Sequence, residues 1–189
     1  MKACIVAVLV VTGLMFVTVP GICFGEDLVV NGGFEQKSDS APLHWEYNRT
    51  RDTKADISLD DTTKHSGNYS YKIDIAPPGG RVTLYPEKDS MKKPATGRTY
   101  RVSLWIKARN LDYNQFFVAP AVRVNFRPTR IRPVPTIDLM AYMKGVKDWT
   151  ELTMDVTVPG GAEGVHLDII LTKGTVWLDD ISIAPVDGR

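Results

Sequence analysis

Seven short runs of alternating apolar and polar residues constrain the fold of this chain more than any other feature of its sequence. The runs are YSYKIDI (69–75), RVTLYP (81–86), YRVSLWIKA (100–108), FFVAPAVRVNF (116–126), ELTMDVTV (151–158), GVHLDIILT (164–172) and VWLDDISI (176–183). A period of two is typical of strands with one buried face, and clusters of Gly, Pro, Asn and Asp, which favour turns, separate the runs. The pattern predicts an all-β fold, an antiparallel β-sandwich or jelly roll. Residues 136–145 could hold one helical turn inside a long loop.

The first 25 residues differ from the rest of the chain. MKACIVAVLVVTGLMFVTVPGICFG has one charged residue, Lys2, followed by an apolar run and then small residues. This pattern predicts a secretory signal peptide cleaved after Gly25, and hence a secreted, periplasmic or cell-surface protein. A membrane anchor is the alternative, although the run is near the lower limit for a span and a Pro-Gly pair closes it. Residues 26–189 would then form a single domain with no membrane span.

Charge and cysteine content exclude several classes of protein. Both cysteines, Cys4 and Cys23, lie in the expected signal peptide, so the rest of the chain has neither disulfides nor thiol chemistry. The chain has 23 basic and 22 acidic residues, and removal of Lys2 with the signal makes the two numbers equal. A nucleic-acid partner is therefore not expected.

No motif in the sequence indicates an enzyme. Glycoside hydrolysis needs two carboxyl groups about 5 to 10 Å apart in a cleft, and no spacing pairs the strand acids Glu151, Asp155 and Asp168. A G-x-S-x-G elbow is absent, and the three histidines lack the spacing of H-E-x-x-H. We therefore expect a protein without catalytic activity of its own.

Alternation divides the strand residues into an inner and an outer set. The expected inner residues are Tyr100, Val102, Leu104 and Ile106 in the third run, Val122, Val124 and Phe126 in the fourth, and Val165, Leu167, Ile169 and Leu171 in the sixth. The outer set contains Trp105 among polar residues. An exposed indole beside planar polar groups suits a sugar, whose C–H faces pack on aromatic rings while its hydroxyls form hydrogen bonds. The alternative is that Trp105 only covers an edge or packs under a loop.

The last run contains two adjacent acids, and period two places one of them among core residues. Asp179 shares a face with Trp177, Ile181 and Ile183, whereas Asp180 falls on the opposite face, where we expect a solvated or edge residue. A buried ionised carboxylate without a partner costs several kcal/mol. Asp179 therefore needs a metal ion, backbone amides or a basic residue beside it.

Five segments resemble a known family in their order along the chain. They are LVVNGGFE (28–35) followed by Trp45, KHSGNYSYKID (64–74), GRTYRVSLWIKA (97–108), DWTELTMDVTVP (148–159) and GTVWLDDISI (174–183). Together they resemble a carbohydrate-binding module of the jelly-roll, galactose-binding-domain-like kind, close to families 4, 9, 16 and 22. The resemblance extends from about Asp27 to Ile183.

The resemblance implies a structural calcium ion. It nominates Glu35 and Asp179 as side-chain ligands, and Gly33, Ser66 and Tyr69 as ligands through the backbone or a hydroxyl. Calcium takes six to eight oxygens, including carboxylates and main-chain carbonyls. The alternative is that Asp179 caps backbone amides or pairs with a basic residue, which needs no metal.

The resemblance also implies non-catalytic binding of a polysaccharide or oligosaccharide, in some cases beside a separate glycan-degrading enzyme. It places Trp105 and Lys107 in the binding groove. The polar contacts that it implies on neighbouring strands are Arg123, Asn125, His166 and Asp168, and Trp45 is either a second platform or a packing residue. A one-residue slip in register would reverse every face. The alternative function is a structural or adhesive β-sandwich that contacts proteins at the cell surface.

Four arginines lie within ten residues, where the family pattern does not require them: Arg123, Arg127, Arg130 and Arg132. A long loop, residues 127–147, follows the fourth run. Because guanidinium groups bind carboxylates and sulfates through two parallel hydrogen bonds, the cluster raises the hypothesis of an anionic ligand with uronic acids or sulfate esters. The alternative is a solvated basic loop balanced by Asp138 and Asp148.

Overall fold

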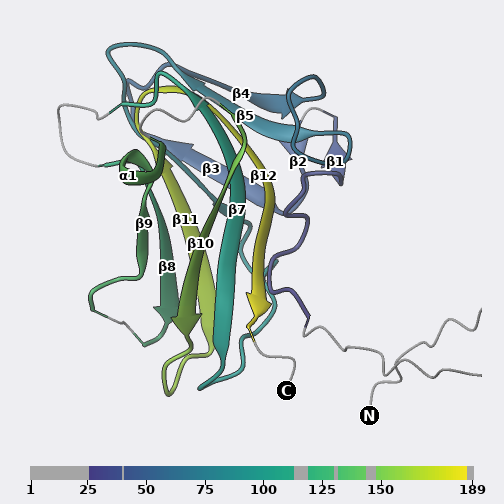
Figure 1. Ribbon diagram of the computed structural model, residues 1–189, viewed down its shortest axis with the longest axis vertical. Helices are drawn as coiled ribbons and strands as arrows, with labels where there is room; N and C mark the ends of the chain where they lie inside the picture. The colour runs from purple at the N-terminus through teal and green to yellow at the C-terminus, as the bar shows by residue number, and fades with distance from the viewer. Residues whose placement is uncertain (1–25, 40, 113–118, 130–131, 144–147, 187–189) are drawn as a thin grey trace, which may run out of the picture.

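Two five-stranded antiparallel sheets make up the fold in the computed structural model, which describes residues 26–39, 41–112, 119–129, 132–143 and 148–186. The expected signal peptide, residues 1–25, lies outside the described residues. The β7 sheet has the strand order β10 (Thr150–Thr157), β7 (Thr99–Arg109), β12 (Gly174–Pro185), β5 (Ser70–Ile75) and β4 (Ala55–Asp60). The β11 sheet has the order β3 (Trp45–Arg49), β6 (Val82–Pro86), β11 (Gly164–Leu171), β8 (Ala121–Arg127) and β9 (Thr136–Asp138). The two sheets form the layers of a sandwich (Figure 1), which confirms the predicted architecture.

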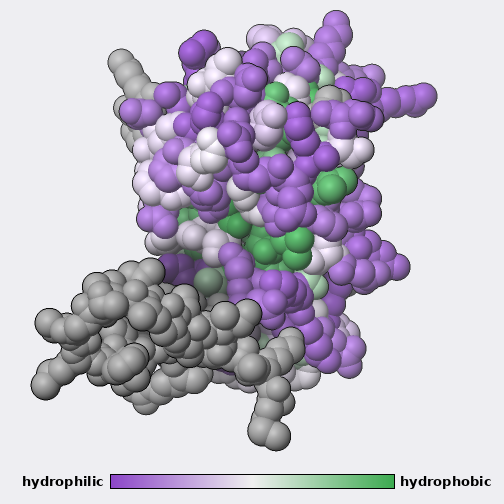
Figure 2. All heavy atoms as spheres, turned by 90° about the vertical axis from the view of Figure 1, so that its right-hand side faces the viewer, coloured by the Kyte–Doolittle hydropathy of each residue, from purple (hydrophilic) through white to green (hydrophobic). Residues whose placement is uncertain are grey.

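Little regular structure lies outside these sheets. Lys37–Ser38 (β1) and Ala41–Pro42 (β2) form a small hairpin, and Leu139–Met143 (α1) is a short helix within the stretch where one helical turn was expected. In the part of the chain that the structure describes, no helix is long and apolar enough to cross a membrane. The face on the side of β1 and β2 is mostly hydrophilic, with a small hydrophobic area near its middle (Figure 2).

The core lies between the two sheets and consists of the residues that alternation directs inward. Val102, Leu104 and Ile106 of β7 are at most 1% exposed, and their counterparts on β8 and β11 are buried as well. Of the expected inner residues only Val165 is half-buried, packed against the core at its margin. Full burial of one such side chain contributes about 1.5 to 3 kcal/mol, so this apolar layer is the main source of stability.

Besides the small β1–β2 hairpin, three strands of the two large sheets were not predicted from the sequence. Strands β3, β4 and β9 all stand at an edge of their sheet, where a strand pairs on one side only. In β3 the four residues after Trp45 are exposed, and in β4 no residue is fully buried. Edge strands with few buried residues lack the clean apolar alternation that identifies a central strand.

A β-bulge in β12 corrects the prediction for the last strand. The register with β7 shifts between Asp179 and Ser182, and Asp180 has a φ of 47°. Before the bulge Leu178 points into the core, while Asp179 lies opposite Trp105 on the outer face. The extra residue shifts the alternation by one position, so that Ile181, and not Asp180, points into the core. The prediction that Asp179 faces the core was therefore wrong.

The same prediction was wrong for Trp177 and correct for Ile183. Trp177 precedes the bulge and lies on the outer face, where its Nε1 donates a hydrogen bond to Asp60 at 2.9 Å. Ile183 follows the bulge and is buried in the core. Alternation counts residues, so it fails wherever a strand contains one residue more than its partner.

The N-terminal segment packs against β12 immediately after the bulge. The backbone N–H of Ile181 donates to the carbonyl of Gly32 at 3.0 Å, and the N–H of Leu28 donates to the carbonyl of Ile183 at 3.0 Å. The approach is so close that a Cβ atom on Gly32 would overlap the Ile181 carbonyl oxygen. Only glycine lets the two backbones meet here.

We predict that Gly32→Ala destabilises the protein by at least about 1 to 3 kcal/mol, because the methyl group forces the two backbones apart. Urea unfolding of the variant measures the loss. Gly160→Ala is the matched control, since a Cβ atom there would meet nothing within 4 Å and the stability should stay close to that of the wild type. Equal stability of the two variants would contradict this account of the close approach.

Candidate functional site

A groove of about 980 Å³ lies on the outer face of the β11 sheet. It crosses β8 and β11 and is bounded by the segment that leads from β8 to β9. Its lining residues with polar or charged side chains are Asn125, Arg127, Arg132, Glu163, His166 and Asp168. Three of them, Asn125, His166 and Asp168, are residues for which the family resemblance implied sugar contacts.

A hydrogen-bonded network around Asp168 forms the floor of the groove. The amide Nδ2 of Asn125 donates to Asp168 Oδ2 at 3.0 Å, and His166 Nε2 lies 3.1 Å from Asp168 Oδ1. Asn125 pairs with His166, and Arg123 with Asp168, across the two strands. The side chains of His166 and Asp168 are each 26% exposed, so the network is fixed by the protein and still open to solvent. The prediction that these four residues share one face was correct.

An aromatic side chain that the sequence reasoning missed completes this surface. Tyr85 of β6 is half-buried, and its ring centroid lies 5.8 Å from that of His166 at an interplanar angle of 43°. The signal was present in RVTLYP, because alternation places Thr83 and Tyr85 opposite the core residues Val82 and Leu84. A tyrosine ring beside fixed polar groups supplies both a packing face and hydrogen bonds.

Trp105 and Lys107 do not lie in this groove, so the expectation that they share one surface with Asn125, His166 and Asp168 was wrong. Both lie on the outer face of β7, in the other sheet, and the outer faces of a sandwich point in opposite directions. The His65 ring stacks on Trp105 with centroids 3.7 Å apart and an interplanar angle of 13°. Lys107 Nζ pairs with Asp148 at 3.2 Å. Alternation shows which side of its own sheet a residue occupies, but not to which sheet its strand belongs.

Trp45 is a packing residue rather than a second platform. Its side chain is 7% exposed, and its ring lies 5.2 Å from that of Phe34. The indole Nε1 donates to the carbonyl oxygen of Asn31 at 2.9 Å. Because the ring is enclosed and its one donor is used, Trp45 offers no surface to a ligand.

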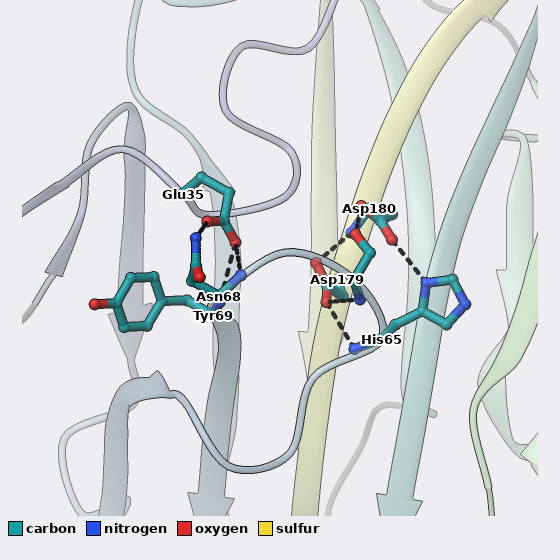
Figure 3. Close-up of polar contacts among 7 residues, drawn as sticks. Glu35, His65, Asn68, Tyr69, Asp179 and Asp180 are labelled. Carbon is teal, nitrogen blue, oxygen red and sulfur yellow. Dashed lines mark hydrogen bonds and ion pairs between the residues drawn. The ribbon is translucent and has the colours of Figure 1, made fainter.

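A second polar centre holds the loop of residues 61–69, which joins β4 to β5, against the β7 sheet (Figure 3). Three carboxylates accept hydrogen bonds from six of its backbone N–H groups. The acceptors and donors are Asp60 with Thr62 and Thr63, Asp179 with His65 and Ser66, and Glu35 with Asn68 and Tyr69. The loop is thereby tied to the N-terminal segment, to β4 and to β12.

Asp179 and Asp180 have different partners within this centre. Asp179 is 0% exposed; its Oδ2 accepts from the amides of His65 and Ser66, and its Oδ1 accepts from the amide of Asp180. Asp179 therefore caps backbone amides. Asp180, which was expected to be solvated, is half-buried; its Oδ2 lies 2.7 Å from His65 Nδ1, and its Oδ1 accepts from Ser66 Oγ at 2.8 Å.

Burial raises the pKa of Asp179, and the nearby charge of Asp180 acts in the same direction, whereas the amides of Ser66 and His65 oppose them. For Glu35 the balance is reversed. Burial tends to raise its pKa, but hydrogen bonds from Tyr69 and Asn68 outweigh this and lower it. Compared with water, this environment disfavours the ionised form of Asp179, and the amide hydrogen bonds offset part of that effect.

The residues nominated for calcium lie around this centre. Glu35, Ser66, Tyr69 and Asp179 all take part in the contacts of the 61–69 loop. A Cβ atom on Gly33 would lie 3.9 Å from Asp179 Oδ1 and 4.0 Å from Glu35 Cγ, so Gly33 is adjacent to both acids. The described residues contain no group of three or more His, Cys, Asp and Glu side chains arranged to hold a metal ion. A site here would combine two carboxylates with main-chain oxygens, a set of ligands that suits calcium.

We predict that Asp60→Ala destabilises the protein by about 1 to 3 kcal/mol, because it leaves the donors of Thr62, Thr63 and Trp177 without their acceptor. Burial tends to raise the pKa of Asp60, but these hydrogen bonds lower it well below its usual value. The stabilisation is complete above the unfolded pKa of 3.8 and is lost as the pH falls towards the folded value.

Urea unfolding should therefore show that the difference in unfolding free energy between wild type and Asp60→Ala becomes smaller as the pH is lowered from about 5 to about 2. Asp61→Ala, at the exposed neighbouring position, is the control and should unfold like the wild type. A gap that is constant over this pH range would show that the Asp60 carboxylate does not anchor the loop in its ionised form.

The solved structures compared below show the fold alone, because each is less than 25% identical to this chain. The enzymatically active domain of tailspike protein 4 of bacteriophage CBA120 has a TM-score of 0.59 and 13% identity; the match covers 85% of this chain and 21% of that one. A cyclase from Fischerella sp. TAU has a TM-score of 0.58 and 14% identity, with 87% and 99% covered. A structure described as "CBM4 structure and function" has a TM-score of 0.51 and 19% identity, with 83% and 99% covered. The fold is thus shared by enzymes and a binding module.

The chain therefore spans about a fifth of the length of the tailspike domain. A search of curated protein sequences found no match. The family model described as "Carbohydrate binding domain" (CBM_4_9) matches residues 26–175, which include the groove and every strand except most of β12. With this match and the jelly-roll fold, the chain belongs to the CBM_4_9 family of carbohydrate-binding domains.

Proposed function

We propose that this domain binds a polysaccharide or oligosaccharide in the groove of the β11 sheet, and that it does so without catalysing a reaction. The observation that carries the proposal is the network of Asn125, His166 and Asp168, fixed in position and open to solvent beside Tyr85. A surface of this kind needs no rearrangement to receive a sugar.

The chemistry of the groove matches that of a sugar ring. The Tyr85 ring is not part of the groove lining but lies beside His166, and it offers an adjacent face on which C–H groups can pack. Each oxygen of Asp168 accepts one hydrogen bond from the protein and retains a second acceptor position for a sugar hydroxyl. Because the side chains are already held by one another, binding costs little additional rotamer entropy.

The placement of Glu151 and Asp155 argues against hydrolysis by either of these acids together with Asp168. Glu151 and Asp155, which the sequence left as conceivable partners of Asp168, lie on β10 in the other sheet. Asp155 also forms a bidentate ion pair with Arg101, at 2.8 and 3.0 Å. Neither acid can therefore act on a substrate held beside Asp168. Export by residues 1–25 is part of the proposal and would bring the domain to extracellular polysaccharides, where a separate glycan-degrading enzyme is a fitting partner.

Affinity electrophoresis against a panel of soluble neutral, uronic and sulfated polysaccharides tests the proposal. Asp168→Ala and Tyr85→Ala should each weaken binding by about tenfold or more, since the first removes charged hydrogen bonds and the second removes the packing face. Glu151→Gln, on the outer face of the other sheet, is the matched control and should bind like the wild type.

The outcome is decisive only for folded variants, so circular dichroism and urea unfolding accompany the gels. Wild-type mobility that no polysaccharide changes would end the proposal. Unchanged affinity of folded Asp168→Ala and Tyr85→Ala would remove the sugar site from the β11 sheet and direct attention to the surface around Trp105.

We also propose that a structural calcium ion binds beside Gly33, held by the carboxylates of Glu35 and Asp179. Main-chain oxygens near Ser66 and Tyr69 would complete the ligands. The support is that carboxylate oxygens of two acids and the side chain of a third come together at Gly33: a Cβ atom there would lie 3.4 Å from Asp180 Oδ1, 3.9 Å from Asp179 Oδ1 and 4.0 Å from Glu35 Cγ. A divalent cation here would neutralise these acids and join the N-terminal segment to β12.

If calcium binds, a chelator should lower the melting midpoint of the wild-type protein, and excess calcium should restore it. Asp179→Ala should melt at a lower temperature and show little further response to chelator. Asp155→Ala is the control, because Asp155 is a surface acid of the same sheet, and it should respond to chelator like the wild type. A wild-type midpoint that neither chelator nor calcium moves would refute the ion.

A further inference from the structure

We infer that the groove selects an anionic glycan, one whose sugars carry carboxylate or sulfate groups; this inference rests on the proposed glycan binding. Two arginines, Arg127 at the end of β8 and Arg132 in the segment before β9, line the groove with exposed side chains. They stand at one end of it, beyond the polar floor around Asp168. Arg130 lies outside the described residues.

Neither guanidinium has an anionic partner in the described part of the chain. The ion pairs found there use other cations, such as Arg101 with Asp155 and Lys107 with Asp148. Arg127 and Arg132 therefore present their N–H forks to solvent. An arginine fork binds a carboxylate or sulfate through two parallel hydrogen bonds, and these are stronger than bonds to neutral hydroxyl groups.

The acids that could have balanced this loop are used elsewhere. Asp148 contacts Lys107 on the other sheet, and Asp138 accepts a hydrogen bond from the backbone N–H of Met140. A basic loop balanced by Asp138 and Asp148 was the alternative to an anionic ligand, and neither acid contacts these arginines. The positive charge at this end of the groove is thus available to a ligand.

The groove has a part with hydrogen-bond acceptors around Asp168 and a part with positive charge around Arg127 and Arg132. Asp168 already accepts hydrogen bonds from Asn125 and His166, and its remaining acceptor positions suit neutral hydroxyl groups. Glu163 is exposed near the arginines, and its backbone N–H donates to the carbonyl of Arg127 at 2.7 Å, but its carboxylate forms no ion pair with either guanidinium. Two cations against one acid make this end net positive. A glycan with a charged group at one sugar and hydroxyls at the next would match both parts.

Isothermal titration with three probes tests the inference: polygalacturonate for carboxylates, a sulfated galactan for sulfates, and arabinoxylan oligosaccharides for a neutral glycan. We expect at least one anionic probe to bind about tenfold or more tightly than the neutral one, and this preference to shrink as sodium chloride is raised. The probe that binds better identifies the charged group.

Two sets of variants test whether the preference for an anionic glycan depends on Arg127 and Arg132. The double variant Arg127→Gln, Arg132→Gln should lower affinity for the preferred anionic probe by about tenfold or more, and so reduce the ratio of anionic to neutral affinity. Arg101→Gln removes an exposed arginine that is already paired, on the other sheet, and should leave that ratio unchanged. Salt-resistant binding of the neutral probe as tight as that of both anionic probes would overturn the inference and leave the proposed function intact. Binding of none of the probes would overturn both.

Discussion

Carboxylates that bind backbone amides are the constraint on which much of this structure depends. Glu35, Asp60 and Asp179 come from the N-terminal segment, β4 and β12, and each accepts two adjacent N–H groups of the 61–69 loop. An acid as buried as Asp179 is tolerable because its charge is met by oriented N–H groups. The same contacts place the His65 ring on Trp105. The loop therefore packs on an outer surface of β7 that the sequence predicted to be exposed.

The bulge at Asp180 makes this arrangement possible. Without an extra residue in β12, Asp179 and Ile181 would lie on the same face, and either a charge would enter the core or an apolar residue would leave it. With the bulge, Asp179 faces the loop while Ile181 and Ile183 fill the core. Aspartate tolerates the positive φ of this position better than most residues, and its side chain is held there by His65 and Ser66.

Seven strands could be predicted from the sequence because each has a buried face that imposes a period of two; six lie inside a sheet, and β10 lies at an edge but still buries Leu152 and Val156. The edge strands β3, β4 and β9 could not, since few of their side chains are buried and no apolar alternation results. The polar floor of the groove was predictable to the extent that Asn125, His166 and Asp168 lie on adjacent strands. Trp105 was grouped with residues of the other sheet because strand order depends on long-range pairing, and Tyr85 was missed although its alternation was readable.

We propose that the glycan site lies on the β11 sheet and not on the β7 sheet. A titration of the isotopically labelled protein with a glycan, followed through backbone and side-chain amide resonances, distinguishes the two sheets. We expect the largest chemical-shift changes at Asn125, at its neighbours on β8 and β11, and at Tyr85, with little change around Trp105 and Lys107. Shifts concentrated around Trp105, Trp149 and the 61–69 loop would contradict it.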